Sequence, residues 1–258
     1  MTDTEKISAY LTRIGFTGTP APNLATLIAL QRAHLETVPY ENLDIMRNIP
    51  ISLNLDSLHE KIVIRRRGGY CFELNGLFTW LLRNLGFRVK EYLSRFLRGE
   101  RGIPTRRHRV IHVSIKDEGD FLCDVGVGGT IPRCPLELIL DTANEQNGEI
   151  YRIERKPILG YVLSKWNSGQ QTWGQIYSFT LEEQLETDYI IPSFYCENHP
   201  ASPFRTMDMV HIFTKDGRKS IAGREFRIFS PNGVETATIS TDAEYQKILQ
   251  THFGIVLQ

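Results

Sequence analysis

The residue best placed for chemistry is Cys71, which follows two glycines and opens a segment of helical periodicity. Leucine and phenylalanine recur at helical spacing from Leu74 to Leu85, which predicts a helix that ends near Gly86. A helix N-terminus carries partial positive charge and favours the thiolate, the nucleophilic form of cysteine. The glycines allow a tight turn and leave space for a substrate carbonyl. A buried structural cysteine is the alternative, but this setting favours a catalytic one.

A cysteine nucleophile needs a base and a third group that orients the base. Residues 108–115 and 121–125 read as two strands of a hairpin, with His108 and Asp124 near the same end. Strand alternation puts His112 on the same face as His108. His112 would lie nearer the turn, far from any ligand entry, so we prefer His108 as the base. Taken singly, His108 and Asp124 could each be an ordinary polar residue at the end of a strand. Together with Cys71 they complete a Cys-His-Asp set.

Other residues near these segments could have a structural or a functional role. The arginines 65–67 are either a solvated face or a source of charge near Cys71 and of ion pairs with Glu41 and Glu73. His34 is expected to be a core histidine on one face of a helix. The glycine-rich loop 126–130 lacks the Lys-Ser/Thr of a phosphate-binding P-loop, so we expect it to leave room for the substrate to approach.

The composition describes an ordinary soluble globular chain. It has 258 residues, 41% of them hydrophobic, and 30 basic side chains against 30 acidic ones, so we expect no nucleic-acid or membrane partner. The chain has no apolar run long enough for a membrane span and no secretory signal at its start. Its four cysteines form no CxxC pair and no zinc pattern, which predicts no metal site and a cytoplasmic location.

The elements that must position these residues fall into three patterns. Helices are expected at 4–17, 24–37 and 55–65, ahead of the cysteine helix. Strands are expected at 88–97, 149–155, 159–165 and 171–179, around the hairpin at 108–125. The last part predicts a short helix or turn at 181–190 with Pro192 beyond it, strands at 207–214, 220–222, 224–230 and 233–239, and a helix at 242–252.

Seven segments in chain order share one further pattern: Tyr10–Gly15, Leu24–Leu27 with His34, Pro39–Leu43, Arg67–Asn75, His108–Val113, Asp124–Gly129 and His199–Phe204. Together they resemble the arylamine N-acetyltransferase family. The most specific matches are the RGGxCxE signature around Cys71 and the DVGxGG segment that begins at Asp124.

The resemblance implies an α+β fold of three domains. These are an N-terminal helical bundle over residues 1–87, a central antiparallel β-barrel over 88–195, and a C-terminal α/β lid over 196–258. Its Cys-His-Asp core is similar to that of papain-like and transglutaminase-like enzymes. The first domain would carry the cysteine, and the barrel would carry the histidine and the aspartate.

The resemblance also implies a reaction, the N-acetylation of arylamines and arylhydrazines by a ping-pong route. Acetyl-coenzyme A would acylate Cys71, and the small-molecule acceptor would then attack this thioester. His108 would pair with the thiolate and move protons, while Asp124 would orient the imidazole. Family resemblance assigns coenzyme contacts to Gly126, Gly128, Gly129 and Ser202, and acceptor contacts to Phe72, Val127 and Phe204.

Two departures from the family pattern bear on specificity. The family usually has an aromatic residue where this chain has Val127, so the acceptor pocket is expected to be wider here. The chain is short at its C-terminus, which affects the coenzyme side of the lid. Another Cys-His-Asp enzyme, such as a transglutaminase-like protein or a cysteine hydrolase, is the alternative. A non-enzymatic binding protein and a redox sensor at Cys71 are further ones, and the complete triad argues against the former.

Overall fold

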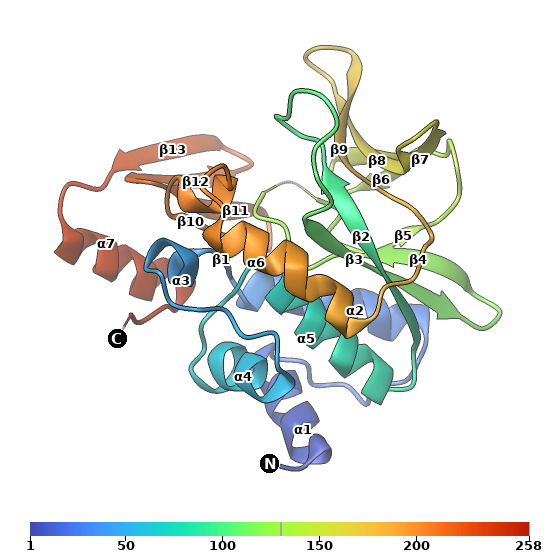
Figure 1. Cartoon of the computed structure of the whole chain (residues 1–258), viewed down its shortest axis with the longest axis horizontal. Helices are drawn as coiled ribbons and strands as arrows, with labels where there is room; N and C mark the ends of the chain where they lie inside the picture. The colour runs from blue at the N-terminus through green and yellow to red at the C-terminus, as the bar shows by residue number, and fades with distance from the viewer. Residues whose placement is uncertain (130, 258) are drawn as a thin grey trace.

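The structure is a computed structural model that describes residues 1–129 and 131–257. Figure 1 shows three regions around one central helix, with the barrel on one side, the C-terminal sheet on the other and small helices below them. The first region contains α1 (Asp3–Arg13), α2 (Leu24–Thr37), β1 (Tyr40–Glu41), α3 (Leu43–Met46), α4 (Leu55–His59), the π-helical turn η1 (Glu60–Ile64) and α5 (Cys71–Asn84).

Helix α5 is the central element of the first region because nearly all of it is buried. Leu74, Leu77, Phe78, Leu81 and Leu82 have no exposed surface, so the helix packs on all sides rather than along one stripe. The helix ends one residue before its C-cap at Leu85, and Gly86 follows with a positive φ of 88°. The predicted helix and its predicted stop are both confirmed.

The second region is a curled antiparallel sheet in the order β5-β4-β3-β2-β9-β8-β7-β6. Leu140, which follows β5, bridges Ile153 of β7, so the sheet nearly closes into a barrel. Its strands are β2 (Arg88–Phe96), β3 (His108–Ile115), β4 (Gly119–Cys123), β5 (Leu136–Glu137), β6 (Asn144–Gln146), β7 (Glu149–Lys156), β8 (Gly160–Asn167) and β9 (Thr172–Phe179).

The third region is a five-stranded antiparallel sheet in the order β1-β10-β11-β12-β13. It has a hydrophobic cluster of its own, formed mainly by its strands and the C-terminal helical segments. The elements are η2 (Glu186–Tyr189), α6 (Ile190–Asn198), η3 (Pro203–Arg205), β10 (Met209–Thr214), β11 (Gly217–Ala222), β12 (Glu225–Ser230), β13 (Gly233–Thr238), α7 (Asp242–Ile248) and the π-helical turn η4 (Leu249–Phe253).

The predicted α+β class is confirmed, and most elements lie within a few residues of their predicted positions. The short helix or turn predicted at 181–190 is present as the 3₁₀ helix η2, but α6 follows it directly and includes Pro192. A first-turn N–H has no intrahelical partner, so proline is tolerated there.

The first helix stops at Arg13, earlier than predicted, and the helix at 55–65 changes from α4 to a π-helical turn. The three domain ranges stay predictions. Strand β1 of the first range pairs with β10 of the third, and α6 runs across residue 195. Both facts tie the C-terminal sheet to the rest of the chain.

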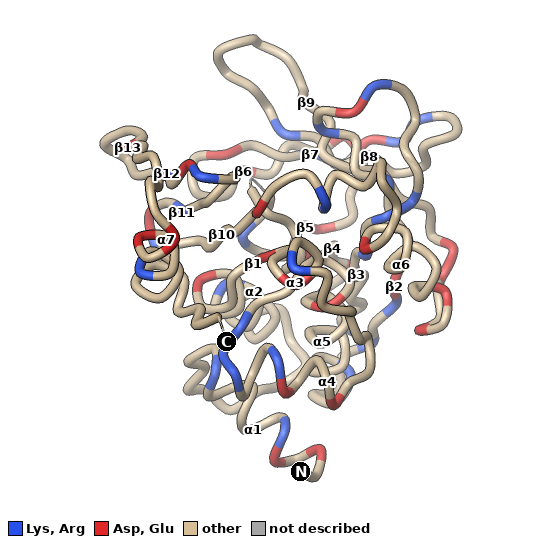
Figure 2. Tube along the Cα trace, turned by 60° about the vertical axis from the view of Figure 1, so that its left-hand side comes forward, with Lys and Arg blue, Asp and Glu red and all other residues tan. Residues whose placement is uncertain are grey.

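Figure 2 shows Lys and Arg positions interspersed with Asp and Glu positions over the trace. Within the described residues, no helix combines the length and the apolar character that a membrane crossing needs.

Candidate active site

Cys71 is the first residue of α5, and the turn that precedes it is held by buried charges. The carboxylate of Glu73 accepts a hydrogen bond of 3.1 Å from the Tyr70 N–H, which would otherwise lack a partner at the helix start. The same carboxylate lies 2.7 Å from Lys61 Nζ. The local sequence therefore fixes where the thiol lies, because a shift of the helix start would break this buried ion pair.

His108 and Asp124 lie together beside this thiol. His108 Nε2 is 2.7 Å from Asp124 Oδ2, and both side chains are buried. This pairing leaves Nδ1 as the ring nitrogen that is available to Cys71, and His108 is close enough to act on the pKa of the Cys71 thiol. The Cys71 Sγ also lies 3.7 Å from the carbonyl oxygen of Arg107. The structure thus brings together the three residues that the sequence singled out.

Asn75 holds Asp124 in place, one turn along α5 from Cys71. Its side-chain amide donates to Asp124 Oδ1 at 2.9 Å and to the carbonyl oxygen of Arg109 at 2.6 Å. Its carbonyl oxygen accepts from the Val125 N–H at 2.9 Å. All of Asn75 is buried, so one side chain connects the cysteine helix to both segments that carry the base and its partner. In the sequence, Asn75 is only the last residue of the motif around Cys71, and no role was predicted for it.

The electrostatics of the site favour a protonated imidazole. Burial lowers the pKa of His108, but the negative charge of Asp124 and its hydrogen bond outweigh burial and raise this pKa to about 10. Burial raises the pKa of the Cys71 thiol, whereas the hydrogen bond and charge of His108 act in the opposite direction. The two groups titrate as a coupled pair, in which imidazolium and thiolate stabilise each other. The start of α5 adds further stabilisation of the thiolate.

His112, the rival base, lies elsewhere. Its Nε2 is 2.9 Å from the exposed Asp120, and its Nδ1 is 2.7 Å from the hydroxyl of Tyr92. The preference for His108 is therefore supported by geometry. His34 is a core residue as expected, fully buried and hydrogen-bonded to Tyr10 at 2.8 Å.

The arginines before Cys71 divide between the two readings left open. Arg67 forms buried ion pairs with Glu41 at 2.8 Å and Asp44 at 2.7 Å, whereas Arg65 pairs with Glu60 at the surface. Glu73 is paired with Lys61 rather than with an arginine. These charges support the turn and do not line the cavity.

A cavity of about 470 Å³ opens beside Cys71, between the barrel and the C-terminal sheet. Of the predicted contact residues, five line it: Gly126, Val127, Gly128, Gly129 and Phe204. Two do not. Phe72 is fully buried against Tyr70 and Tyr189, and Ser202 is fully buried with its hydroxyl donating to the Cys196 carbonyl oxygen at 2.6 Å.

The glycines of segment 126–129 each make space for a specific neighbour. A Cβ at Gly126 would lie 2.7 Å from the Cα of Cys71, and one at Gly128 would lie 2.6 Å from the Tyr40 ring. A Cβ at Gly129 would lie 2.9 Å from the guanidinium of Arg98. These glycines therefore allow protein groups to pack closely around the nucleophile, in addition to lining the cavity.

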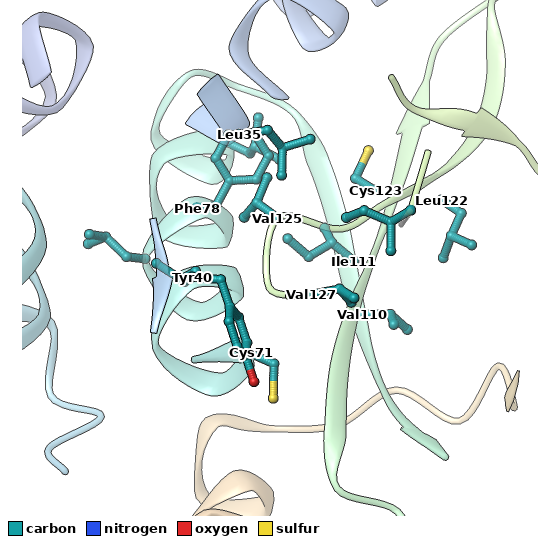
Figure 3. Packing of buried hydrophobic residues seen from close by; sticks show 14 of the residues in the cluster. Leu35, Tyr40, Cys71, Phe78, Val110, Ile111, Leu122, Cys123, Val125 and Val127 are labelled. Carbon is teal, nitrogen blue, oxygen red and sulfur yellow. The ribbon is translucent and has the colours of Figure 1, made fainter. Parts of the chain in front are cut away.

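Sequence reasoning missed the wall of the cavity that the C-terminal sheet provides. Figure 3 shows Tyr40 of β1 pointing toward Cys71. Residues of β10, β11 and β12 line the same cavity: Met209, His211, Arg218, Ser220, Ala222 and Phe229. Val210 and Ile221 line it as well.

The arrangement can perform nucleophilic acyl transfer. A buried thiol at a helix start, a protonatable imidazole and a fixed carboxylate are the three groups that this chemistry needs. Among residues 1–129 and 131–257, no group of three or more His, Cys, Asp or Glu side chains could hold a metal ion.

Comparisons with known proteins give one consistent result. The family model described as N-acetyltransferase matches residues 23–258. The arylamine N-acetyltransferase of Escherichia coli is 35% identical over 96% of this chain and 88% of its own length. The arylamine N-acetyltransferase structure from Salmonella typhimurium superposes with a TM-score of 0.92 at 30% identity, over 99% of this chain and 92% of that one. The Mycobacterium marinum enzyme in complex with CoA has a TM-score of 0.90 at 32% identity, over 96% and 92%.

Proposed function

The chain belongs to the arylamine N-acetyltransferase family, and from this premise we propose that it uses acetyl-coenzyme A as donor in a ping-pong reaction through acetyl-Cys71. Acceptors would be arylamines and arylhydrazines. The observation that carries the proposal is the contact of Cys71 with a histidine that Asp124 holds at 2.7 Å, at the edge of a cavity. The complex of a 32% identical relative with CoA supports the donor.

In the first half-reaction, the Cys71 thiolate attacks the thioester carbonyl of acetyl-coenzyme A. The N–H of Cys71, at the first position of α5 and outside the helical ladder, is a suitable donor to the oxyanion. The tetrahedral intermediate collapses, the carbon–sulfur bond to the coenzyme breaks, and the imidazolium of His108 gives its proton to the departing thiolate. Acetyl-Cys71 and neutral His108 remain.

In the second half-reaction, the nitrogen of the acceptor attacks the acetyl-Cys71 carbonyl. Neutral His108 takes the proton that this nitrogen loses, and collapse of the intermediate restores the thiolate and the imidazolium. An arylamine is largely unprotonated at neutral pH, so it is already a nucleophile. Asp124 and Asn75 keep the imidazole in one orientation through both halves, since their contacts do not involve the reacting atoms.

The alternative of a cysteine hydrolase uses the same three residues but gives water the role of the acceptor. The burial of Cys71, with only 2% of its surface exposed, favours an organic acceptor that fills the cavity and displaces water. A cytoplasmic location is part of the proposal, since the four cysteines are unpaired and such thiols suit a reducing compartment.

The test is intact-protein mass spectrometry after mixing with acetyl-coenzyme A in the absence of amine. Wild type is expected to gain one acetyl group, which leaves when an arylamine is added, and Cys71→Ala is expected to gain none. Cys123→Ala is the matched control, because Cys123 is also fully buried but lies on β4 away from the cavity lining.

Three results would contradict the proposal. An unmodified wild type excludes acetyl-coenzyme A as donor. An adduct on Cys71→Ala excludes Cys71 as the nucleophile. An adduct that disappears at the same rate with and without arylamine identifies a hydrolase.

A further inference from the structure

Helix α6 has a buried face and an exposed apolar face. On the buried face, Ser193 forms a hydrogen bond with the hydroxyl of Tyr70, the residue before the nucleophile. On the other face, Ile190, Ile191 and Phe194 are 56%, 76% and 64% exposed. Residues three and four apart lie on one side of a helix, so these three side chains form one continuous apolar surface. Figure 1 shows α6 on the near side of the molecule, in front of α5.

A groove of about 450 Å³ lies beside this exposed face. Ile190 and Phe194 line the groove from α6. The segment 45–53, between α3 and α4, lines it with five apolar residues: Ile45, Ile49, Pro50, Ile51 and Leu53. Among the residues that the structure describes, the groove has no lining residue in common with the cavity beside Cys71. Single exposed apolar side chains are ordinary, whereas an apolar groove beside three of them on one helix is typical of a binding surface.

Opposite charges lie at the two ends of this surface. Asp188 is exposed and comes three residues before Ile191, near the N-terminal end of α6. Arg205 lines the groove and donates a hydrogen bond of 2.7 Å to the carbonyl oxygen of Glu197, so it lies at the C-terminal end of α6. Neither Asp188 nor Arg205 forms an ion pair with another described residue.

These features complement themselves when two copies of α6 pack antiparallel. A two-fold axis near Phe194 places the N-terminal end of each helix against the C-terminal end of the other, and it repeats every contact twice. Asp188 of one protomer then faces Arg205 of the other, where opposite charges attract. The exposed ring of Phe194 in each protomer faces the apolar groove of the other. An apolar centre with charges at its rim is the usual composition of a protein interface.

We propose that this chain forms a two-fold symmetric dimer through the exposed face of α6, with Phe194 of each protomer in the groove of the other. A second copy is favoured over a different protein because the surface itself supplies both the protruding ring and the groove, and both the acid and the base. The chain has 30 basic and 30 acidic side chains, so no net charge opposes self-association. The inference is independent of the proposed function.

The experiment is sedimentation velocity of the whole chain over about 1–300 µM, a range that covers the dissociation constants expected for an interface of ordinary size. Wild type is expected to pass from monomer to dimer within this range. Phe194→Glu keeps a good helix former in α6 but brings a charge into the apolar centre. Because a two-fold interface contains each residue twice, the dissociation constant is expected to rise on the order of 100-fold.

Ile191→Glu and Ile158→Glu form a matched pair for this measurement. Both isoleucines are strongly exposed, at 76% and 86%, but Ile158 lies in the turn between β7 and β8 of the barrel. Ile191→Glu is expected to weaken the dimer as Phe194→Glu does, and Ile158→Glu is expected to match wild type. Thermal unfolding of each variant shows whether it keeps its fold, and Ile191→Glu gives the answer if Phe194→Glu does not.

A charge exchange tests the antiparallel arrangement. Arg205→Asp and Asp188→Arg each place like charges opposite one another at both ends of the interface, so each is expected to raise the dissociation constant about tenfold. The double variant with both substitutions restores opposite charges and is expected to recover most of the wild-type affinity. A partner other than a second copy would not show this recovery, because only self-association brings the two exchanged residues together.

Four outcomes overturn the inference. A wild type that stays monomeric over the whole concentration range has no such interface. A dimer that Phe194→Glu and Ile191→Glu leave unchanged forms through another surface. A dimer that Ile158→Glu weakens as much as Ile191→Glu does depends on exposed apolar residues in general. A double charge variant that associates no better than the two single variants excludes the contact between Asp188 and Arg205, and with it the antiparallel packing of α6.

Discussion

Replacement of Asp124 by asparagine is the most direct test of how the site activates its thiol. Asparagine has nearly the same shape and keeps an oxygen for the hydrogen bonds from Asn75 and the Gly126 N–H, at 2.9 and 2.8 Å. Its amide nitrogen then faces His108 Nε2, which must accept a hydrogen bond instead of donating one. The ring proton moves to Nδ1, so His108 can no longer take a proton from Cys71.

The size of the effect follows from the pKa of His108. A rise from 6.5 to about 10 corresponds to roughly 5 kcal/mol in favour of the imidazolium, as an upper limit. Asp124 is the largest favourable cause of that rise. If only about a third of this energy reaches the coupled Cys71 thiolate, the loss is about 1.5 kcal/mol, or roughly tenfold in thiolate population.

The assay is the rate of Cys71 alkylation by iodoacetamide as a function of pH, read by mass spectrometry. The alkylation midpoint of Asp124→Asn is expected to lie at least about one pH unit above that of wild type. Single-turnover acetylation is expected to fall further, on the order of 10³–10⁴-fold, because the wrong tautomer also blocks proton transfer.

Asp120→Asn is the control for this experiment. It makes the same chemical change at the partner of the rival His112, where the two side chains are 2.9 Å apart. Its alkylation profile is expected to match that of wild type. The reasoning is refuted if Asp124→Asn keeps the wild-type profile, or if Asp120→Asn shifts the midpoint by as much as Asp124→Asn does.

Three further predictions concern packing, pH and specificity. Gly126→Ala places a Cβ 2.7 Å from the Cα of Cys71, so the free energy of unfolding should fall by about 1–3 kcal/mol and the rate of acetylation should drop over tenfold. Urea unfolding and mass spectrometry measure these two quantities. Gly169→Ala, in an exposed turn, is the control and should change neither. Burial lowers the pKa of His34 from 6.5 to about 3 in the folded protein. As the pH falls below 6.5, the unfolded chain takes up a proton at His34 before the folded protein does, so the folded state loses stability. The free energy of unfolding is expected to fall by roughly 2.7 kcal/mol by pH 4.5. Urea unfolding of His34→Gln should show a smaller loss of stability over the same pH range, and a loss equal to that of wild type would contradict this prediction. Val127→Phe narrows the cavity, so kcat/KM should fall more for two-ring than for one-ring arylamines, and unchanged relative rates across several amines would exclude Val127 as a determinant of acceptor size.

The catalytic set could be predicted because its signals are local. The helix after Cys71 is read from a spacing that repeats within two turns, and the hairpin with His108 is read from strand alternation around a short turn. Asp124 directly follows β4, so the hairpin itself carries it toward His108. Each of these features depends on residues close in the sequence, and each is present in the structure.

The role of Asn75 could not be predicted, since its partners lie 34 and 49 residues away. Its amide satisfies a carbonyl and a carboxylate that become neighbours only when the barrel packs on α5. Nothing in the residue type distinguishes an asparagine that connects two regions from one that merely lies on a helix. The misassignments of Phe72 and Ser202 have the same origin, because burial decides whether a residue next to a motif reaches the cavity.

The sequence alone therefore predicts the nucleophile, its base and the carboxylate beside the base, and it predicts the helix and the hairpin that present them. Tertiary structure decides the shape and charge of the cavity. Tyr40 lies opposite His211 because β1 pairs with β10, although the two residues are 171 positions apart in the chain (211 minus 40), and Arg218 reaches the same wall through β11. Short-range periodicity is set by backbone geometry, but the register between distant strands is set by packing, which no local pattern contains.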